Sequence, residues 1–217
     1  MPEKPTGNIG PIKIEVKSNS VKDSWEIINF PKEKREIENK IIKKFRYAGE
    51  EAGFVFNDIK ENNENHYDYT LTLPGGEVYL DLMEIIYKKS NQKGSPYEKD
   101  HNWIKNGYYA EQILNQIFKK SNKYQDIGNT PKHLLTYVTH YNFSINENTI
   151  IICQNELRKR RHVFENIFFL DILDDTNSKI RVLYPMANNA ILGDSKLNEL
   201  KNLSYLNLDP KKWSLIA

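Results

Sequence analysis

Three segments of the chain repeat apolar residues with the spacing of an α-helix. The first stripe, in residues 32–53, consists of Ile37, Ile41, Phe45 and Ala48. Pro31, which stands just before it, suits the first turn of a helix. Residues 108–124 and 146–161 carry two further stripes. We therefore predict three main helices over these ranges.

Other segments have the pattern of β-strands. Residues 67–73 and 77–87 are two mostly apolar runs joined by Pro74-Gly75-Gly76, which is typical of a β-hairpin. We predict further strands at residues 54–56, 133–138, 166–173 and 179–185, the last two separated by a turn at 174–178. The chain therefore combines a hairpin with strands connected by helices.

This order of elements predicts an α/β, three-layer domain with a mixed central sheet flanked by helices. We place it at residues 25–187. Residues 1–24 form a polar arm with one alternating run at 12–16. Residues 188–217 form a C-terminal extension, irregular apart from a short helix near 197–206. The polar stretch 88–107 is long for a loop inside a compact domain, which is typical of a functional or disordered segment.

Composition excludes several classes of protein. With 39% hydrophobic residues among 217 and a net charge of +2, the chain is neither disordered overall nor polybasic. Cys153 is the single cysteine, which excludes an intrachain disulfide and a multi-cysteine zinc site. The chain contains no HExxH, P-loop or GxGxxG motif. Its start lacks the apolar core of a signal peptide, and no apolar run approaches the roughly 20 residues that span a bilayer. We expect a cytoplasmic protein with no membrane partner.

Three acids stand inside the predicted hairpin: Asp68, Asp81 and Glu84. Aspartate has poor β-propensity, and a buried charge without a partner is costly. A divalent metal ion bound by hard oxygen ligands is the commonest reason for a sheet to hold such residues.

The order of elements, with an acid in each of two neighbouring strands, resembles the PD-(D/E)xK nuclease superfamily, the restriction-endonuclease-like fold. The resemblance covers residues 32–185. It implies Mg²⁺, with Mn²⁺ as a substitute, held by Asp68, by Glu84 or Asp81, and by a first-helix acid such as Glu38 or Glu36. It also implies hydrolysis of phosphodiester bonds in nucleic acid, with DNA favoured and RNA as the alternative, in restriction, phage defence or repair.

The chain departs from the family pattern at the motif lysine. Two residues after the acid it has Ile86 (after Glu84) or Met83 (after Asp81). Lys88 at the end of the strand, or Lys119 and Lys120 on the second helix, would have to supply the charge. The alternative hypothesis is a catalytically inactive nuclease-fold subunit that serves as a nucleic-acid-binding or assembly module in a larger complex.

The hairpin register decides which acid accompanies Asp68. With Pro74-Gly75-Gly76 as a three-residue loop, Asp68 shares a face with Glu84. With a two-residue Gly75-Gly76 turn, it shares a face with Asp81. We favour Glu84 and keep Asp81 as the alternative.

Two basic stretches are candidates for nucleic-acid binding. The run Arg158, Lys159, Arg160 and Arg161 ends the third predicted helix and suits phosphate contacts. The 88–106 loop mixes lysines such as Lys93 with aromatics such as Trp103, which suits stacking on unpaired bases. A protein partner or a homodimer is consistent with this fold, but no motif identifies one.

Overall fold

The computed structural model describes residues 8–9, 12–17, 20–25, 28–62, 67–88, 103–125, 128–186 and 191–206. Its centre is a six-stranded sheet in the order β11-β10-β9-β7-β6-β5. These strands are β5 (Asp58–Glu61), β6 (Tyr69–Leu73), β7 (Gly76–Glu84), β9 (Lys132–Tyr137), β10 (Asn166–Ile172) and β11 (Ser178–Tyr184). β9 runs parallel to β7 and β10, whereas the pairs β5–β6, β6–β7 and β10–β11 are antiparallel, so the sheet is mixed.

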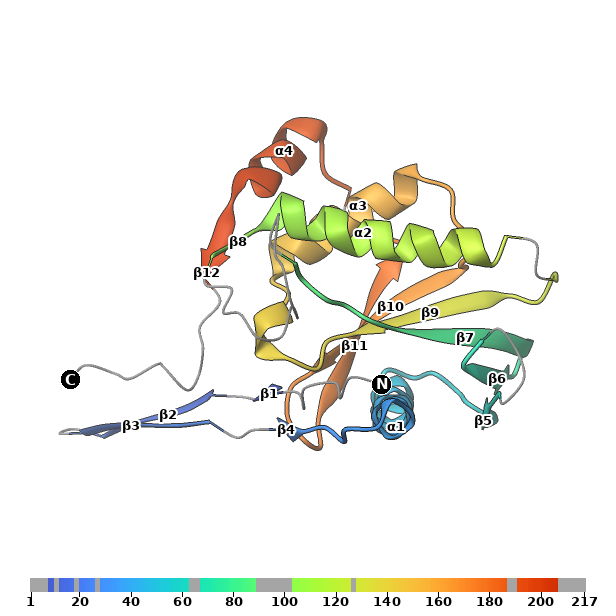
Figure 1. Cartoon of the computed structure of the whole chain (residues 1–217), viewed down its shortest axis with the longest axis horizontal. Coiled ribbons are helices and arrows are strands. Elements are labelled where there is room, and N and C mark those ends of the chain that lie inside the picture. Colours follow the sequence, from blue (N-terminus) through green and yellow to red (C-terminus); the bar gives the residue numbers. More distant parts are fainter. Residues whose placement is uncertain are drawn as a thin grey trace.

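Helices cover both faces of the sheet (Figure 1). α1 (Lys34–Glu51) packs on one face. α2 (Asn106–Lys123), α3 (Glu147–Lys159) and α4 (Asp194–Asn202) lie on the other face. Each face of the sheet has its own buried apolar cluster, because successive side chains of a strand point to opposite sides. The predicted α/β, three-layer architecture with a mixed sheet is confirmed.

The three predicted helices are present, with ends shifted by a few residues. α3 begins where Asn146 accepts a hydrogen bond from the Thr149 N–H, an N-cap that stabilises its first turn. The strand predicted at 54–56 begins later, at Asp58. The aromatic residues that suggested it pack instead on the α1 side of the sheet, where Phe56 contacts the Phe45 ring with centroids 5.6 Å apart.

The β6–β7 turn differs from both predicted forms. Leu73 pairs with Gly76, so the two-residue turn consists of Pro74 and Gly75. Gly76 has a φ of +123°, a conformation that residues with a Cβ rarely adopt. The ladder pairs Tyr69 with Leu80, and its continuation places Asp68 opposite Asp81. The favoured pairing of Asp68 with Glu84 on one face is therefore wrong, because the actual turn shifts the register by one residue.

Smaller elements flank the central domain. Near the N-terminus, β1 (Asn8–Ile9) pairs with β4 (Ile28–Asn29), and β2 (Ile12–Lys17) pairs with β3 (Ser20–Trp25), so the alternating run at 12–16 is a strand. β8 (Trp103–Lys105) pairs with β12 (Ser204–Leu206). Leu197 and Leu200 of α4 are buried in the cluster beneath α2 and α3, so the described part of the C-terminal extension shares that core.

No helix within the described ranges is long and apolar enough to cross a membrane.

Candidate functional site

The candidate site lies where β7 continues past the start of β6. Tyr79 and Ile85 donate their N–H groups to backbone oxygens on the β9 side, those of Pro131 and Tyr137. The N–H and carbonyl of Leu82 point the other way, toward the β6 side of β7. No strand lies there, because β6 begins only at Tyr69, opposite Leu80. Two side chains replace the missing strand. Asp68 Oδ2 accepts a hydrogen bond from the Leu82 N–H (2.7 Å), and Lys120 Nζ donates to the Leu82 carbonyl (2.8 Å).

Asp81 is the buried acid of this site, with 2% of its surface exposed. Its Oδ2 accepts hydrogen bonds from Lys120 Nζ at 2.5 Å and from the Tyr124 hydroxyl at 2.8 Å. Tyr124 is the C-cap residue directly after α2, four residues beyond Lys120, so the two side chains lie on the same side of the helix end. α2 therefore supplies both the cation and the hydroxyl donor that make burial of this carboxylate tolerable.

The neighbouring acid, Asp68, has a pKa well above its ordinary value. Burial, a side-chain hydrogen bond with Asp81 and the negative charge of Asp81 raise the pKa of Asp68 to about 6. The Leu82 N–H and the charge of Lys120 act in the opposite direction but do not compensate. Two close carboxylates with one ammonium group leave a deficit of positive charge, which a proton or a metal cation would supply.

A hollow of about 350 Å³ opens onto these groups. Its lining residues come from α1, the β6–β7 region and α2, with one residue from β9: Lys34, Glu38, Asp68, Asp81, Leu82, Met83, Glu84, Ile86, Lys120, Lys123, Tyr124 and Tyr137. Five residues predicted from the sequence are thus brought to one place: Glu38, Asp68, Asp81, Glu84 and Lys120.

The two remaining acids of this hollow have other partners. Glu38 pairs with Lys34 at 3.1 Å. Burial tends to lower the pKa of Lys34. The hydrogen bond with Glu38 and the charges of the surrounding acids outweigh burial and raise this pKa. Glu84 accepts a hydrogen bond from the Thr139 hydroxyl, and its parity on β7 is that of Leu82, which packs on the α1 side. Asp81, not Glu84, is therefore the carboxylate beside Asp68.

Lys88 is not among the residues that line the acidic hollow. Its backbone N–H and carbonyl are held by the Gln112 side chain at 2.8 and 2.7 Å. It lines a separate hollow with Gln112 and Gln116 of α2. Lys120 is the predicted lysine that reaches the acids.

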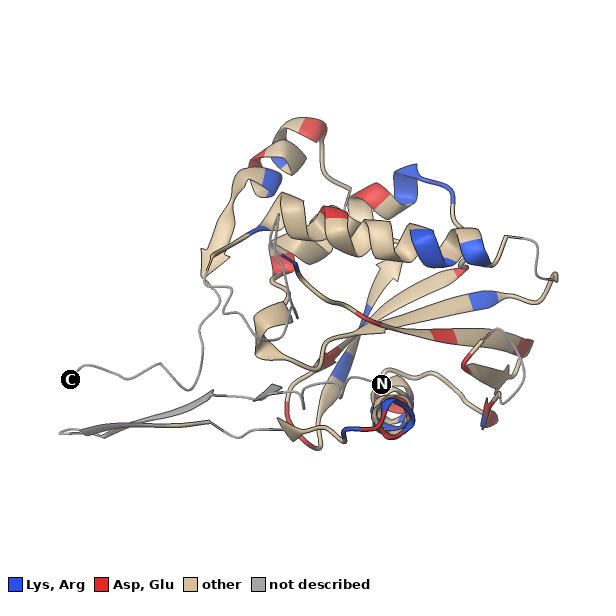
Figure 2. Cartoon of the chain, in the orientation of Figure 1, with Lys and Arg blue, Asp and Glu red and all other residues tan. Residues whose placement is uncertain are grey.

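The predicted nucleic-acid contacts are spread over the surface. Figure 2 shows basic positions gathered at the C-terminal ends of α2 and α3, and acidic positions on β7 beneath α2. Trp103 is 65% exposed on β8, at the opposite end of α2 from Lys120. Asn106 and Lys120 are 14 positions apart on α2, a rise of roughly 21 Å. Lys93 lies outside the described residues.

Sequence reasoning missed three members of the site: Tyr124, Lys34 and the Leu82 backbone. Tyr124 follows Lys120 by four residues, so helical spacing was a signal that would have found it. No comparable signal identifies Lys34 or Leu82. Lys34 joins the site because α1 packs close to the hairpin. The Leu82 backbone joins it because β6 begins only at Tyr69 and leaves Leu82 without a strand partner on that side.

The donor set suits a hard divalent cation only in part. Two carboxylates and the Leu82 carbonyl oxygen are ligands of the kind that Mg²⁺ prefers. Within the described ranges, however, no group of three or more histidine, cysteine, aspartate or glutamate side chains is arranged to hold a metal ion. A metal would bind through Asp68 and Asp81, completed by backbone oxygen and water, and would replace the Lys120 ammonium as the main countercharge of Asp81.

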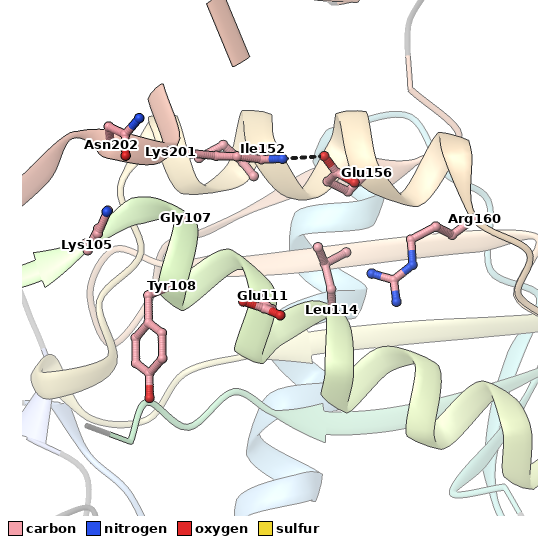
Figure 3. Close-up of a pocket in the computed structure, with 10 residues that line it drawn as sticks. All are labelled: Lys105, Gly107, Tyr108, Glu111, Leu114, Ile152, Glu156, Arg160, Lys201 and Asn202. Atoms are coloured by element: carbon pink, nitrogen blue, oxygen red, sulfur yellow. Dashed lines mark hydrogen bonds and ion pairs between the residues drawn. The ribbon is translucent and has the colours of Figure 1, made fainter. Parts of the chain in front are cut away.

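A hollow larger than the acidic one lies elsewhere, between α2, α3 and α4 (Figure 3). Its volume is about 560 Å³. It has an apolar floor that includes Leu114 and Ile152, and Lys201 neutralises Glu156 across it at 2.7 Å. Because its acids do not converge and Glu156 is already paired, we place the candidate chemistry in the acidic hollow.

Comparison of the chain with models of known protein families, with curated proteins and with solved structures gives no match.

Proposed function

We propose that this protein is a metal-dependent nuclease that hydrolyses phosphodiester bonds, with DNA as the favoured substrate and RNA as the alternative. The observation that carries the proposal is the contact of Asp68 with Asp81 beside the Lys120 ammonium, in an open hollow at the end of the β6–β7 hairpin. The raised pKa of Asp68 supports the proposal, because functional sites concentrate charge that the fold alone does not neutralise.

Each residue has a defined part in this proposal. Asp68 and Asp81 would hold Mg²⁺, which supplies Lewis-acid polarisation of a phosphate and a more acidic bound water. Lys120 would place its ammonium group beside the scissile phosphate, where it would stabilise developing negative charge. Tyr124 keeps one hydrogen bond on Asp81 and so holds that carboxylate in place.

A second candidate function, a nuclease-fold subunit that binds or assembles without catalysis, has its own support. Asp81 already accepts hydrogen bonds from Lys120 and Tyr124, which is a satisfied structural network. The lysine also comes from α2 and not from the position two residues after the acid.

A cleavage assay separates the two functions. Purified protein is incubated with supercoiled plasmid, single-stranded DNA and RNA, each with Mg²⁺, Mn²⁺ or EDTA. The variants are Asp68→Asn and Lys120→Met, with Glu77→Gln as the control for loss of an exposed acid on β7. Metal-dependent cutting that both site variants lose and the control retains would support the nuclease. Folded protein that cuts none of the three substrates would favour the non-catalytic subunit.

A further inference from the structure

A second concave site, rich in positive charge, lies at the C-terminal end of α3. Its volume is about 350 Å³, and it is lined by Arg158, Lys159, Arg160, Arg161, His162 and Tyr184. α3 ends at Lys159, and Arg160 has extended backbone with φ −122° and ψ 138°. Consecutive basic side chains therefore surround one hollow, because the chain leaves the helix within this run.

Three of these cations have no acidic partner in the part of the chain that the structure describes. Lys159 pairs with Asp194 at 3.1 Å. No described carboxylate lies within ion-pair distance of Arg158, Arg160 or Arg161. The Arg160 guanidinium stacks on the Phe118 ring, 3.9 Å from its centroid. Stacking fixes the position of this charge, and Arg160 lines both this hollow and the one between α2, α3 and α4.

His162 adds an imidazole to the lining of the hollow. Its ring forms a hydrogen bond with the backbone of Phe164, and its Nδ1 atom is buried. The imidazole meets the Tyr184 ring edge to face, with centroids 4.4 Å apart. The His162 ring is thus held by packing in the wall of the hollow, beside the arginine run.

We propose that this hollow binds the terminal phosphate of a nucleic-acid strand. A terminal phosphate carries close to two negative charges near pH 7 and three exposed oxygens, whereas an internal diester carries one charge. Guanidinium groups bind such oxygens in pairs of hydrogen bonds. Three guanidinium charges around one small volume match the dianionic end of a strand better than the single charge of each backbone diester. The identity of the ligand as nucleic acid rests on the proposed function.

The position of the hollow relates it to the acidic site. The Val163 N–H donates to Ser121 Oγ at 3.0 Å, so the chain after the hollow is anchored to the residue that follows Lys120. Both sites therefore adjoin the C-terminal part of α2, which also carries Lys120.

The test is a binding measurement that does not depend on cleavage. Asp68→Asn protein in EDTA is titrated against 12-nucleotide single-stranded DNA with an internal fluorophore, ending in a 5′-phosphate, a 3′-phosphate or hydroxyls only. We expect a phosphate at one end to tighten binding about tenfold, and the two phosphorylated probes identify which end. The double variant Arg158→Gln, Arg161→Gln should abolish this preference, while Lys43→Gln on α1, which removes one exposed charge from the opposite layer, should preserve it.

Two outcomes would overturn the proposal: equal affinity for all three probes, or equal weakening of all three by the arginine variants. The outcome also separates the two sites. If the wild-type protein cuts nothing but the binding assay shows an end preference, the phosphate site is kept and the nuclease is rejected. If the wild-type protein cuts with metal but no end preference is found, the nuclease is kept and the phosphate site is rejected.

Discussion

The surroundings of Asp68 in the acidic hollow oppose its negative charge. Burial and the neighbouring Asp81 raise its pKa from the ordinary 3.8 to about 6, so folding favours the protonated carboxyl. Between these two pH values the folded state binds more protons than the unfolded state. The free energy of unfolding therefore falls as pH rises from about 4 to about 6, and Asp68 is destabilising at neutral pH in the absence of a cation.

This sign predicts the behaviour of Asp68→Asn. The amide oxygen can still accept the Leu82 N–H, whereas the repulsion from Asp81 disappears. We expect the melting temperature of the variant, followed by circular dichroism, to exceed that of the wild type at pH 7.5 and to approach it at pH 4.5. A variant that melts lower at pH 7.5 would show instead that the ionised Asp68 stabilises the fold.

Asp81 should behave in the opposite way, because its charge is compensated. Asp81→Ala leaves the Lys120 ammonium and the Tyr124 hydroxyl without their acceptor. We expect the free energy of unfolding, measured by urea titration, to fall by about 2–4 kcal/mol. The cost of breaking a fully buried pair is somewhat higher, but Lys120 is partly exposed and can be solvated. Glu77→Ala, at an exposed position of the same strand, is the control. A loss no larger than that of the control would contradict the network.

At the scale of elements, the hairpin turn decides which acids meet. Gly76 closes a two-residue turn in a conformation that favours glycine, and this register sets Asp68 opposite Asp81. A turn one residue longer would have shifted the pairing of β7 by one residue, and every side chain of β7 would then lie on the other face relative to Asp68. The position of a single glycine thus controls the composition of the site.

The turn offers a matched pair of variants. Gly76→Ala should lower the free energy of unfolding by about 1–3 kcal/mol, because alanine is strained at a φ of +123°. Gly75→Ala should have little effect, since no heavy atom lies within 4 Å of the added Cβ and its φ is not in the positive range that strains other residues. Thermal melts of both variants measure the difference. Equal destabilisation would mean that backbone strain at Gly76 is not what sets the turn.

At the scale of the molecule, the acidic hollow is assembled from three layers. α1 supplies Lys34 and Glu38, the hairpin supplies Asp68 and Asp81, and α2 supplies Lys120 and Tyr124. The site therefore exists only in the folded state, so a cation that binds it must stabilise the fold as a whole.

Metal addition tests this coupling. If Mg²⁺ or Mn²⁺ binds at Asp68 and Asp81, saturation to 100 times the dissociation constant raises the free energy of unfolding by about 2.7 kcal/mol. The effect should weaken below pH 6, because protons compete for Asp68. Calorimetric titration and melting curves at pH 7.5 and 5.5 measure it, with Asp68→Asn as the comparison. An equal shift in that variant would place the metal elsewhere, and no shift would favour the non-catalytic subunit.

The sequence by itself determined the fold class and most of the candidate site residues. Helical and strand periodicity report which residues are buried, and burial depends on local pattern, so α1, α2, α3 and the strands β6, β7, β9, β10 and β11 were predictable from it, whereas β5 lies outside the predicted 54–56. Acids in strand sequence also stood out without a structure, because charge is rare there.

Only the tertiary structure decided how these residues are joined. The turn register chose Asp81 over Glu84, and the packing of α2 over β7 chose Lys120 over Lys88. Both choices depend on contacts between residues far apart in the chain. A shift of one residue in a strand, or of one turn in a helix, leaves the local hydrophobic pattern almost unchanged and yet replaces the partners of every side chain.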